Sequence, residues 1–273
     1  MNSALHSVIQ GLCELPQQLR WSYLPPLMVY LAAGVSGLTA IVGTFFIKDY
    51  LNLSAAFLAS LGFWAGLPWA LKMPLGHLVD LIWNYKAYLV GLGAAVIAAS
   101  LLIMYGLIGH TGFMASIMPV ETWFVTSVVL GPVGYVIQDV VADAMTVEAV
   151  PEQDKNGNRI NPYQLKIMHT TMQTLGRFAI IGGTVLVSLA NVIIFTDVDS
   201  LDTAARIDLY ADIYLYALII PLISIAGVVL ARLQHSYRNA RAQQAHNIAT
   251  SPHQPLKSTG QFCWAVLCLW CFR

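Results

Sequence analysis

The residues of this chain best suited to proton or ion chemistry are three carboxylates near its middle. Asp139, Asp143 and Glu148 lie within QDVVADAMTVE (138–148), directly after the nearly uncharged run VTSVVLGPVGYVI. Asp139 and Asp143 are four residues apart, so a helix would place both on one face. Such a pair could take up protons, pair with a basic side chain, or hold Mg²⁺ on a diphosphate. The solvent around the segment decides between these chemistries.

The composition indicates that this solvent is lipid. The chain of 273 residues is 57% hydrophobic and only 10% charged, whereas soluble domains carry about 25% charged residues. The formal net charge is zero, which gives no indication of nucleic-acid binding. The cysteines lack the paired spacing of a zinc site, and we expect plain thiols, with no metal and no cofactor. These cysteines are Cys13, Cys263, Cys268 and Cys271.

Six apolar stretches have, or nearly have, the ~20 residues that a helix needs to cross a bilayer. They are residues 24–47, 51–72, 88–109, 120–142, 177–195 and 210–231. Backbone groups in lipid must be bonded internally, so these stretches should be helices. The sequence therefore predicts an all-α integral membrane protein with a six-transmembrane-helix bundle at 24–233. Residues 1–23 lack a basic start and are predicted to be a cytoplasmic segment, not a signal peptide.

The distribution of lysine and arginine predicts a cytoplasmic N-terminus in the inner or plasma membrane. With that orientation twelve basic residues face the cytoplasm, and only Lys48 and Arg206 lie outside. Residues 234–261 are polar and are predicted to form a cytoplasmic linker. Residues 262–273 are apolar but too few to cross a bilayer. We expect them to begin a second half of the protein; the alternative is a tail on the membrane surface.

The depth of the charged residues predicts a cluster between the fourth and fifth spans. Asp139 lies ~28 Å and Arg177 ~27 Å from the outer ends of their helices at 1.5 Å per residue. Gln173 shares a helix face with Arg177. We therefore predict an Asp139/Asp143–Arg177 cluster; the alternative is that these charges lie among lipid headgroups without specific contacts. Glu148 is predicted to be a solvated helix end.

Proline residues predict two helix boundaries. Pro151 disfavours helix at the residue before it, so the fourth helix should end near there. Asn161 followed by Pro162 predicts the start of the next helix, with an N-cap residue and a proline at the first helical position.

A membrane prenyltransferase is a weaker alternative. The two aspartates form a DxxxD motif, and such enzymes need a second aspartate-rich motif facing the first to hold Mg²⁺ on a diphosphate. The other acidic cluster, Asp197, Asp199 and Asp202, is predicted on the opposite side of the membrane. The sequence therefore favours a protein that is not an enzyme.

The turn after the second span resembles the helix 2–3 signature of the major facilitator superfamily. Gly76-x-x-x-Asp80 followed by Lys86 carries this resemblance. Glycine permits close helix packing, aspartate can cap a neighbouring helix, and the basic residue anchors the loop inside. Four positions depart from the signature, which usually shows basic residues or glycine there. They are Leu81, Trp83, Asn84 and Tyr85.

Three stretches resemble the folate–biopterin transporter family within that superfamily. They are LGFWAGLPWALKMPLGHLVD (61–80), GPVGYVIQDVVADAMTVE (131–148) and TMQTLGRF (171–178). The resemblance implies the N-terminal half of a transporter built from two six-helix halves, and a pteridine- or folate-like solute moved with protons. Five residues are predicted to act in substrate binding or coupling: Gln138, Asp139, Asp143, Gln173 and Arg177. Their depth favours a cytoplasmic gate formed by the two aspartates with Arg177 as their partner. Gly76 and Asp80 would then act as a latch between the second and third helices.

Other readings of the same residues remain open. The chain could belong to a major-facilitator transporter of another organic solute, or to a membrane partner or assembly factor that does not transport. Gly131 and Pro132 interrupt the fourth span, and this break either lines a solute path or is a simple kink. The partners expected if the chain is part of a transporter are lipid, a small solute, protons where transport is coupled to them, and a second six-helix half.

Overall fold

The computed structural model describes residues 20–46, 54–82, 85–153, 157–196 and 198–250. The described residues are helical, apart from turns and an isolated bridge between Gln153 and Arg159. Internal contacts divide the chain into two units, Met1–Arg232 and Leu233–Arg273. The first unit holds nearly all of the helices, so it is the unit that positions any functional site.

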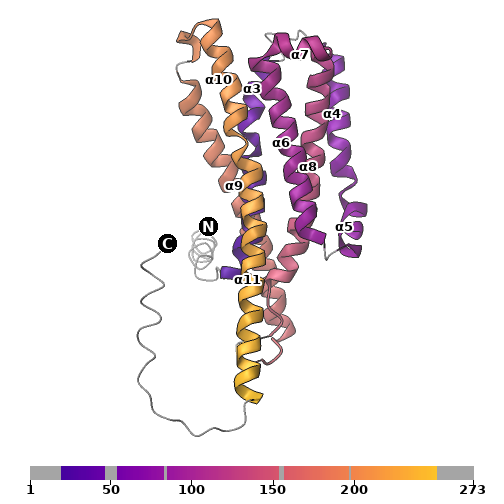
Figure 1. Cartoon of the computed structure of the whole chain (residues 1–273), viewed down its shortest axis with the longest axis vertical. Helices are drawn as coiled ribbons and strands as arrows, with labels where there is room; N and C mark the ends of the chain where they lie inside the picture. Colours follow the sequence, from indigo (N-terminus) through magenta and orange to yellow (C-terminus); the bar gives the residue numbers. More distant parts are fainter. Residues whose placement is uncertain (1–19, 47–53, 83–84, 154–156, 197, 251–273) are drawn as a thin grey trace, which may run out of the picture. The chain divides into compact units, whose positions relative to one another are not determined.

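The helices are labelled in Figure 1. Their bounds are α2 (Leu24–Val35), α3 (Ala40–Phe46), α4 (Ala55–Ala70), α5 (Lys72–Leu81), α6 (Lys86–Gly109), α7 (Thr111–Ile117), α8 (Val120–Ala149), α9 (Pro162–Phe195), α10 (Thr203–Tyr216) and α11 (Ile219–Thr250), with short 3-10 turns η2 (Trp21–Tyr23), η3 (Ser36–Thr39) and η6 (Val198–Ser200).

Five helical stretches within the described residues are long and apolar enough to cross a membrane. They are Trp21–Thr44, Lys86–Gly109, Val120–Ala149, Pro162–Phe195 and Thr203–Tyr237. The prediction of an all-helical, multi-pass membrane protein is therefore confirmed. The second predicted span corresponds to α4, which has 16 residues and a length of about 24 Å, less than the ~30 Å of hydrocarbon. The count of six spans remains a prediction.

The apolar spans belong to longer helices. The helix α8 extends from the span at 120–142 to Ala149, close to the end predicted from Pro151. The helix α9 begins at Pro162, where the Asn161 side chain caps it by accepting a hydrogen bond from the Tyr163 amide. That start was expected from Asn161 and Pro162, but the helix is far longer than its apolar part. The helix α11 continues to Thr250 and so includes the first part of 234–261, where the sequence predicts a linker. Residues 251–273 lie outside the described residues.

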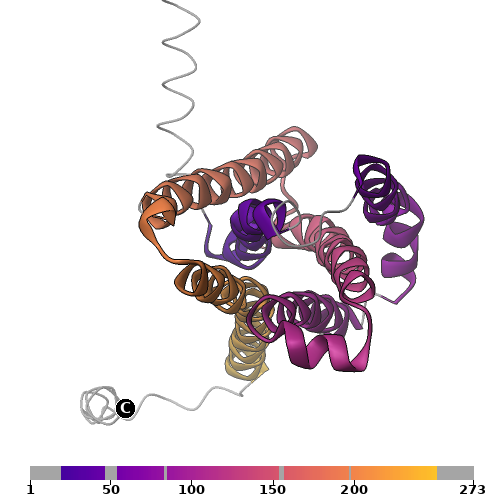
Figure 2. The same cartoon turned by 90° about the horizontal axis from the view of Figure 1, so that it is seen from above.

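Two helix pairs organise the first unit, α6 with α8 and α2 with α9. Figure 2 shows the members of each pair side by side. The first pair crosses at Gly93 and Gly134, where a Cβ on Gly134 would lie 2.7 Å from the Gly93 carbonyl oxygen. The second pair crosses at Gly34, where a Cβ would lie 2.3 Å from the Ile180 carbonyl oxygen. Only glycine allows these backbones to touch.

Contacts between helix ends indicate that successive long helices run in opposite directions. Tyr23, Val150 and Met172 pack together, so the start of α2, the end of α8 and the first part of α9 share one end of the unit. At the opposite helix ends, the rings of Phe195 and Tyr210 are 6.2 Å apart. This alternation is the one assumed in counting lysine and arginine. The assignment of the first end to the cytoplasm remains a prediction.

Candidate functional site

The two aspartates of the DxxxD motif share one cation. The Lys72 Nζ atom lies 2.5 Å from Asp139 Oδ2 and 2.8 Å from Asp143 Oδ2. Lys72 is the first residue of α5, and only Leu71 separates it from Ala70, the last residue of α4. The α4–α5 junction is therefore held against α8 by an ammonium group between two carboxylates. The Asp139 side chain is 11% exposed and that of Asp143 is 48% exposed, so the more deeply buried carboxylate has the shorter contact.

A tyrosine from a third helix completes this group. The Tyr30 hydroxyl on α2 donates a hydrogen bond of 2.5 Å to Asp143 Oδ1. Gly176 of α9 makes room for the Tyr30 ring, because a Cβ there would lie 2.8 Å from the ring atom Cε2. Tyr30, Lys72, Asp139 and Asp143 are called the Asp–Lys–Tyr cluster below. It joins α2, α8 and the α4–α5 junction.

The cluster carries one more negative than positive charge. With both carboxylates and the ammonium ionised and Tyr30 neutral, its net charge is −1. One Lys72 ammonium group is therefore shared between two carboxylates, and loss of the charge on either would leave Lys72 with a single ionised partner.

The cation in the cluster differs from the predicted one. Arg177 makes no ion pair with Asp139 or Asp143, although all three residues are described. Both Arg177 and Gln173 are exposed on α9. The reason is the packing of the helices: α9 lies chiefly along α2, whereas α8 packs on α6 and on the α4–α5 segment. Lys72 could have been found from the sequence, because it is a basic residue at the end of an apolar span.

Gln138 is a buried link between helices. Its side chain is 3% exposed. The Gln138 amide nitrogen donates to the Val90 carbonyl oxygen at 3.4 Å, and its amide oxygen accepts from the Ser224 hydroxyl at 2.9 Å. These contacts join α8 to α6 and α11. The side chain is thus already bonded within the chain, and its assignment as a solute contact remains a prediction.

The residues of the predicted helix 2–3 motif, Gly76, Asp80 and Lys86, differ in their contacts. Gly76 approaches Val140 of α8, with 4.0 Å between a Cβ built on Gly76 and Val140 Cγ1. Asp80 is exposed and takes part in none of the ion pairs among the described residues. Lys86 pairs with Glu148 at the end of α8. Glu148, predicted to be a solvated helix end, therefore binds a basic residue at the start of α6.

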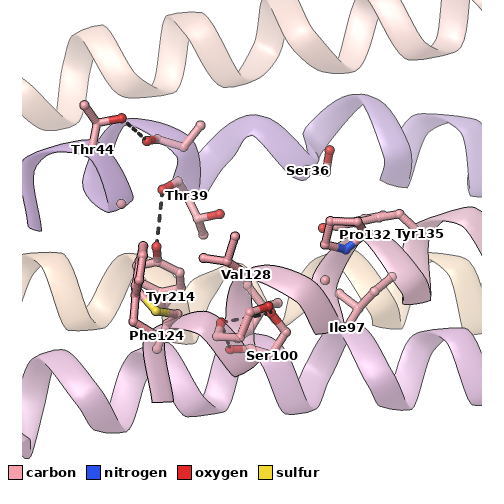
Figure 3. A pocket seen from close by; sticks show the side chains of 16 residues that line it. Ser36, Thr39, Thr44, Ile97, Ser100, Phe124, Val128, Pro132, Tyr135 and Tyr214 are labelled. Carbon is pink, nitrogen blue, oxygen red and sulfur yellow. Dashed lines mark hydrogen bonds between the residues drawn. The ribbon is translucent and has the colours of Figure 1, made fainter. Parts of the chain in front are cut away.

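A cavity lies apart from the cluster, among η3, α3, α6, α8 and α10. Its volume is about 290 Å³, and its walls carry the hydroxyl groups of Ser36, Tyr135 and Tyr214 (Figure 3). A second cavity of about 620 Å³ is lined by Arg20, Arg159 and neighbouring polar residues. Within the described part of the chain, no three His, Cys, Asp or Glu residues come together in a way that could hold a metal ion.

The fold and the cluster define the chain as a helical, multi-pass membrane protein with paired charges at a junction of its helices. Part of it is similar to a folate-biopterin transporter of a Synechocystis species, with 30% identity over 132 residues. The match covers 47% of this chain and 24% of that transporter. No family model matches the chain, and no solved structure matches it. The predicted relation to a transporter is therefore supported at the level of sequence.

Proposed function

We propose that the chain is one six-helix half of a major-facilitator-type secondary transporter that carries a folate- or biopterin-like solute. The observation that carries the proposal is the Asp–Lys–Tyr cluster, a partly buried charged group shared by three helical segments. Ionisable groups within a membrane bundle mark ion or solute pathways. The partial similarity to a folate-biopterin transporter supplies the class of solute.

The cluster is proposed to act as a proton-sensitive gate. Lys72 pairs the α4–α5 junction with both carboxylates of α8, and Tyr30 bonds α2 to one of them, Asp143. A proton on Asp139 or Asp143 would remove one of the two charges that hold Lys72. The contact between α5 and α8 would then weaken, which would allow that end of the bundle to open. Transport would thereby be coupled to protons.

A second contact supports a gate at this end. The Lys86–Glu148 pair joins the start of α6 to the end of α8. With the cytoplasmic N-terminus predicted from the basic residues, both ion-pair groups lie toward the cytoplasmic side of the bundle. The proposal accordingly places the gate there. Solute sites in such folds lie nearer the midplane, so it assigns the cluster to gating and coupling and not to solute contact.

Uptake measurements test the proposal. The chain is expressed alone, and also joined to the part of the Synechocystis relative that follows the matched stretch, in a host that cannot take up folate. Labelled folate and biopterin are supplied at several external pH values. We expect pH-dependent uptake by the joined protein, because the proposal requires a second six-helix half.

Variants then test the role of the cluster. Asp139→Asn and Asp143→Asn should each lower uptake by about tenfold or more, which corresponds to ~1.4 kcal/mol. Lys166→Met is the matched control, because it removes an exposed lysine of α9 that belongs to neither ion-pair group. Uptake by both Asn variants at the level of the parent would rule out the gate, and uptake of neither solute would rule out the assigned substrate class.

A further inference from the structure

The hydroxyl-lined cavity is separate from the Asp–Lys–Tyr cluster. None of the four cluster residues lines it. Its volume of about 290 Å³ lies at the small end of the range for ligand pockets, about 300–1,000 Å³. The Phe124 and Tyr214 side chains in its wall are 2% and 5% exposed, so it reaches into the core. It is large enough for a compact ring system and too small for a long, flexible solute.

The walls of the cavity are mainly apolar but carry several hydroxyl groups. None of the residues that line it is Asp, Glu, Lys, Arg or His. Ser100 and Ser127 satisfy each other, since each hydroxyl donates to the backbone oxygen of the other at 2.9 Å. The Tyr214 hydroxyl donates to the Thr39 carbonyl oxygen at 3.5 Å, a long and weak contact that a ligand could replace. Figure 3 shows this hydroxyl beside Thr39.

Irregular backbone surrounds the same space. The first membrane helix is interrupted by η3 at Ser36–Thr39. Pro132 lies inside α8, and since proline has no N–H, the Val128 carbonyl loses its usual helical donor. The fifth candidate span breaks after Tyr216, two residues beyond Tyr214. Interrupted membrane helices present backbone polar groups to solutes in transporters. Three such interruptions therefore meet at or near one cavity.

We propose that this cavity binds the ring system of a pteridine, a flat, uncharged bicyclic heterocycle, against Phe124, Tyr135 and Tyr214. Aromatic side chains pack well on flat rings. Hydroxyl groups both donate and accept, which matches the ring's mixture of N–H donors and nitrogen and oxygen acceptors. A charged tail would stay outside, because a carboxylate in an uncharged cavity is costly. The choice of a pteridine rests on the proposed function.

Direct binding tests the proposal without a transport assay. The purified full chain is placed in lipid nanodiscs and titrated into pterin, whose own fluorescence reports binding. We expect saturable binding of pterin. We expect no competition from p-aminobenzoylglutamate, which is the part of folate without the ring. Competition by that compound at similar concentration, or no pterin binding at all, would overturn the proposal.

Two variants locate the bound ring. Val128→Phe fills the cavity from α8 and should weaken pterin binding by about tenfold or more. Val185→Phe is the matched control: Val185 is 61% exposed on α9 and does not line the cavity. Tyr214→Phe keeps the ring but removes the hydroxyl, and should weaken binding by roughly three- to tenfold. Because Tyr214→Phe is a small change, it tests the cavity even if Val128→Phe does not fold.

The outcomes separate this proposal from the proposed function. If Val128→Phe and Tyr214→Phe bind pterin as well as Val185→Phe does, the cavity is not the site, even if uptake depends on the cluster. If the cavity variants weaken pterin binding while Asp139→Asn leaves uptake intact, the cavity stands and the gate fails.

Discussion

Removal of the Lys72 ammonium is the perturbation whose size the structure defines best. Lys72→Met keeps an unbranched side chain of similar length but leaves Asp139 and Asp143 without their shared cation. Exposed ion pairs contribute about 0.2–1 kcal/mol, whereas a charge left unpaired in the interior costs about 3–5 kcal/mol. Asp139 is 11% exposed but Lys72 is 37% exposed. The expected loss is therefore intermediate, about 2 kcal/mol in the free energy of unfolding.

The measurement is a comparison of unfolding in mild detergent, followed by tryptophan fluorescence. Lys86→Met is the control, because Lys86 and Glu148 are 27% and 43% exposed and their pair should contribute less than about 1 kcal/mol. The double variant Lys72→Met/Asp139→Asn should recover part of the loss, because it also removes the buried unpaired charge. A loss no larger than that of the control, or strictly additive effects in the double variant, would refute the reasoning.

Three further predictions test the remaining geometry. Tyr30→Phe removes the hydroxyl that binds the cluster and should cost about 1 kcal/mol of unfolding free energy; an unchanged unfolding curve would show that the bond contributes nothing. Gly134→Ala puts a methyl group 2.7 Å from a backbone oxygen of α6 and should cost about 1–3 kcal/mol of unfolding free energy. Gly62→Ala, where a Cβ would have nothing within 4 Å, should be neutral or stabilising. Equal effects of the two variants would contradict the close crossing of α6 and α8. In a background without native cysteines, Asn158→Cys and Ser200→Cys should react with impermeant maleimide from opposite sides of the membrane, and labelling from one side would overturn the chain path.

Local features of the fold were predictable because they depend on short stretches of sequence. The scarcity of charge indicated lipid. Four-residue spacing placed Asp139 and Asp143 on one helix face, and both contact the same ammonium group. The Asn161–Pro162 pair marked the start of α9, and the structure has that cap. Each of these inferences needed no knowledge of which helices are neighbours.

The choice of cation in the cluster depended on such knowledge. Counting residues along the helices placed Arg177 and Asp139 at one depth, but equal depth does not make two helices pack together. Glycine contacts between α2 and α9, at Gly34 and Gly183, hold α9 along α2. This leaves the basic residue at the α4–α5 junction, Lys72, beside α8. Long-range packing of this kind is not visible in hydropathy.

The break between α10 and α11 was hidden for a related reason. Hydropathy runs without interruption through residues 210–231, so the sequence predicted one helix there. In the structure α10 ends at Tyr216 and α11 begins at Ile219. An apolar turn in the core gives no polar signal, and Pro221 is compatible with the first turn of the new helix. The cavity near Tyr214 could not have been located without this break.

The contact between Gly93 and Gly134 limits how the protein can move. Where two backbones touch without side chains between them, sliding one helix along the other drives the next residue, such as Ile97, into a main chain. The Ser100–Ser127 hydrogen bonds fasten the same pair a few residues further on. During any conformational change, α6 and α8 should therefore move together as one rigid body. Bending would then be confined to the helices around them.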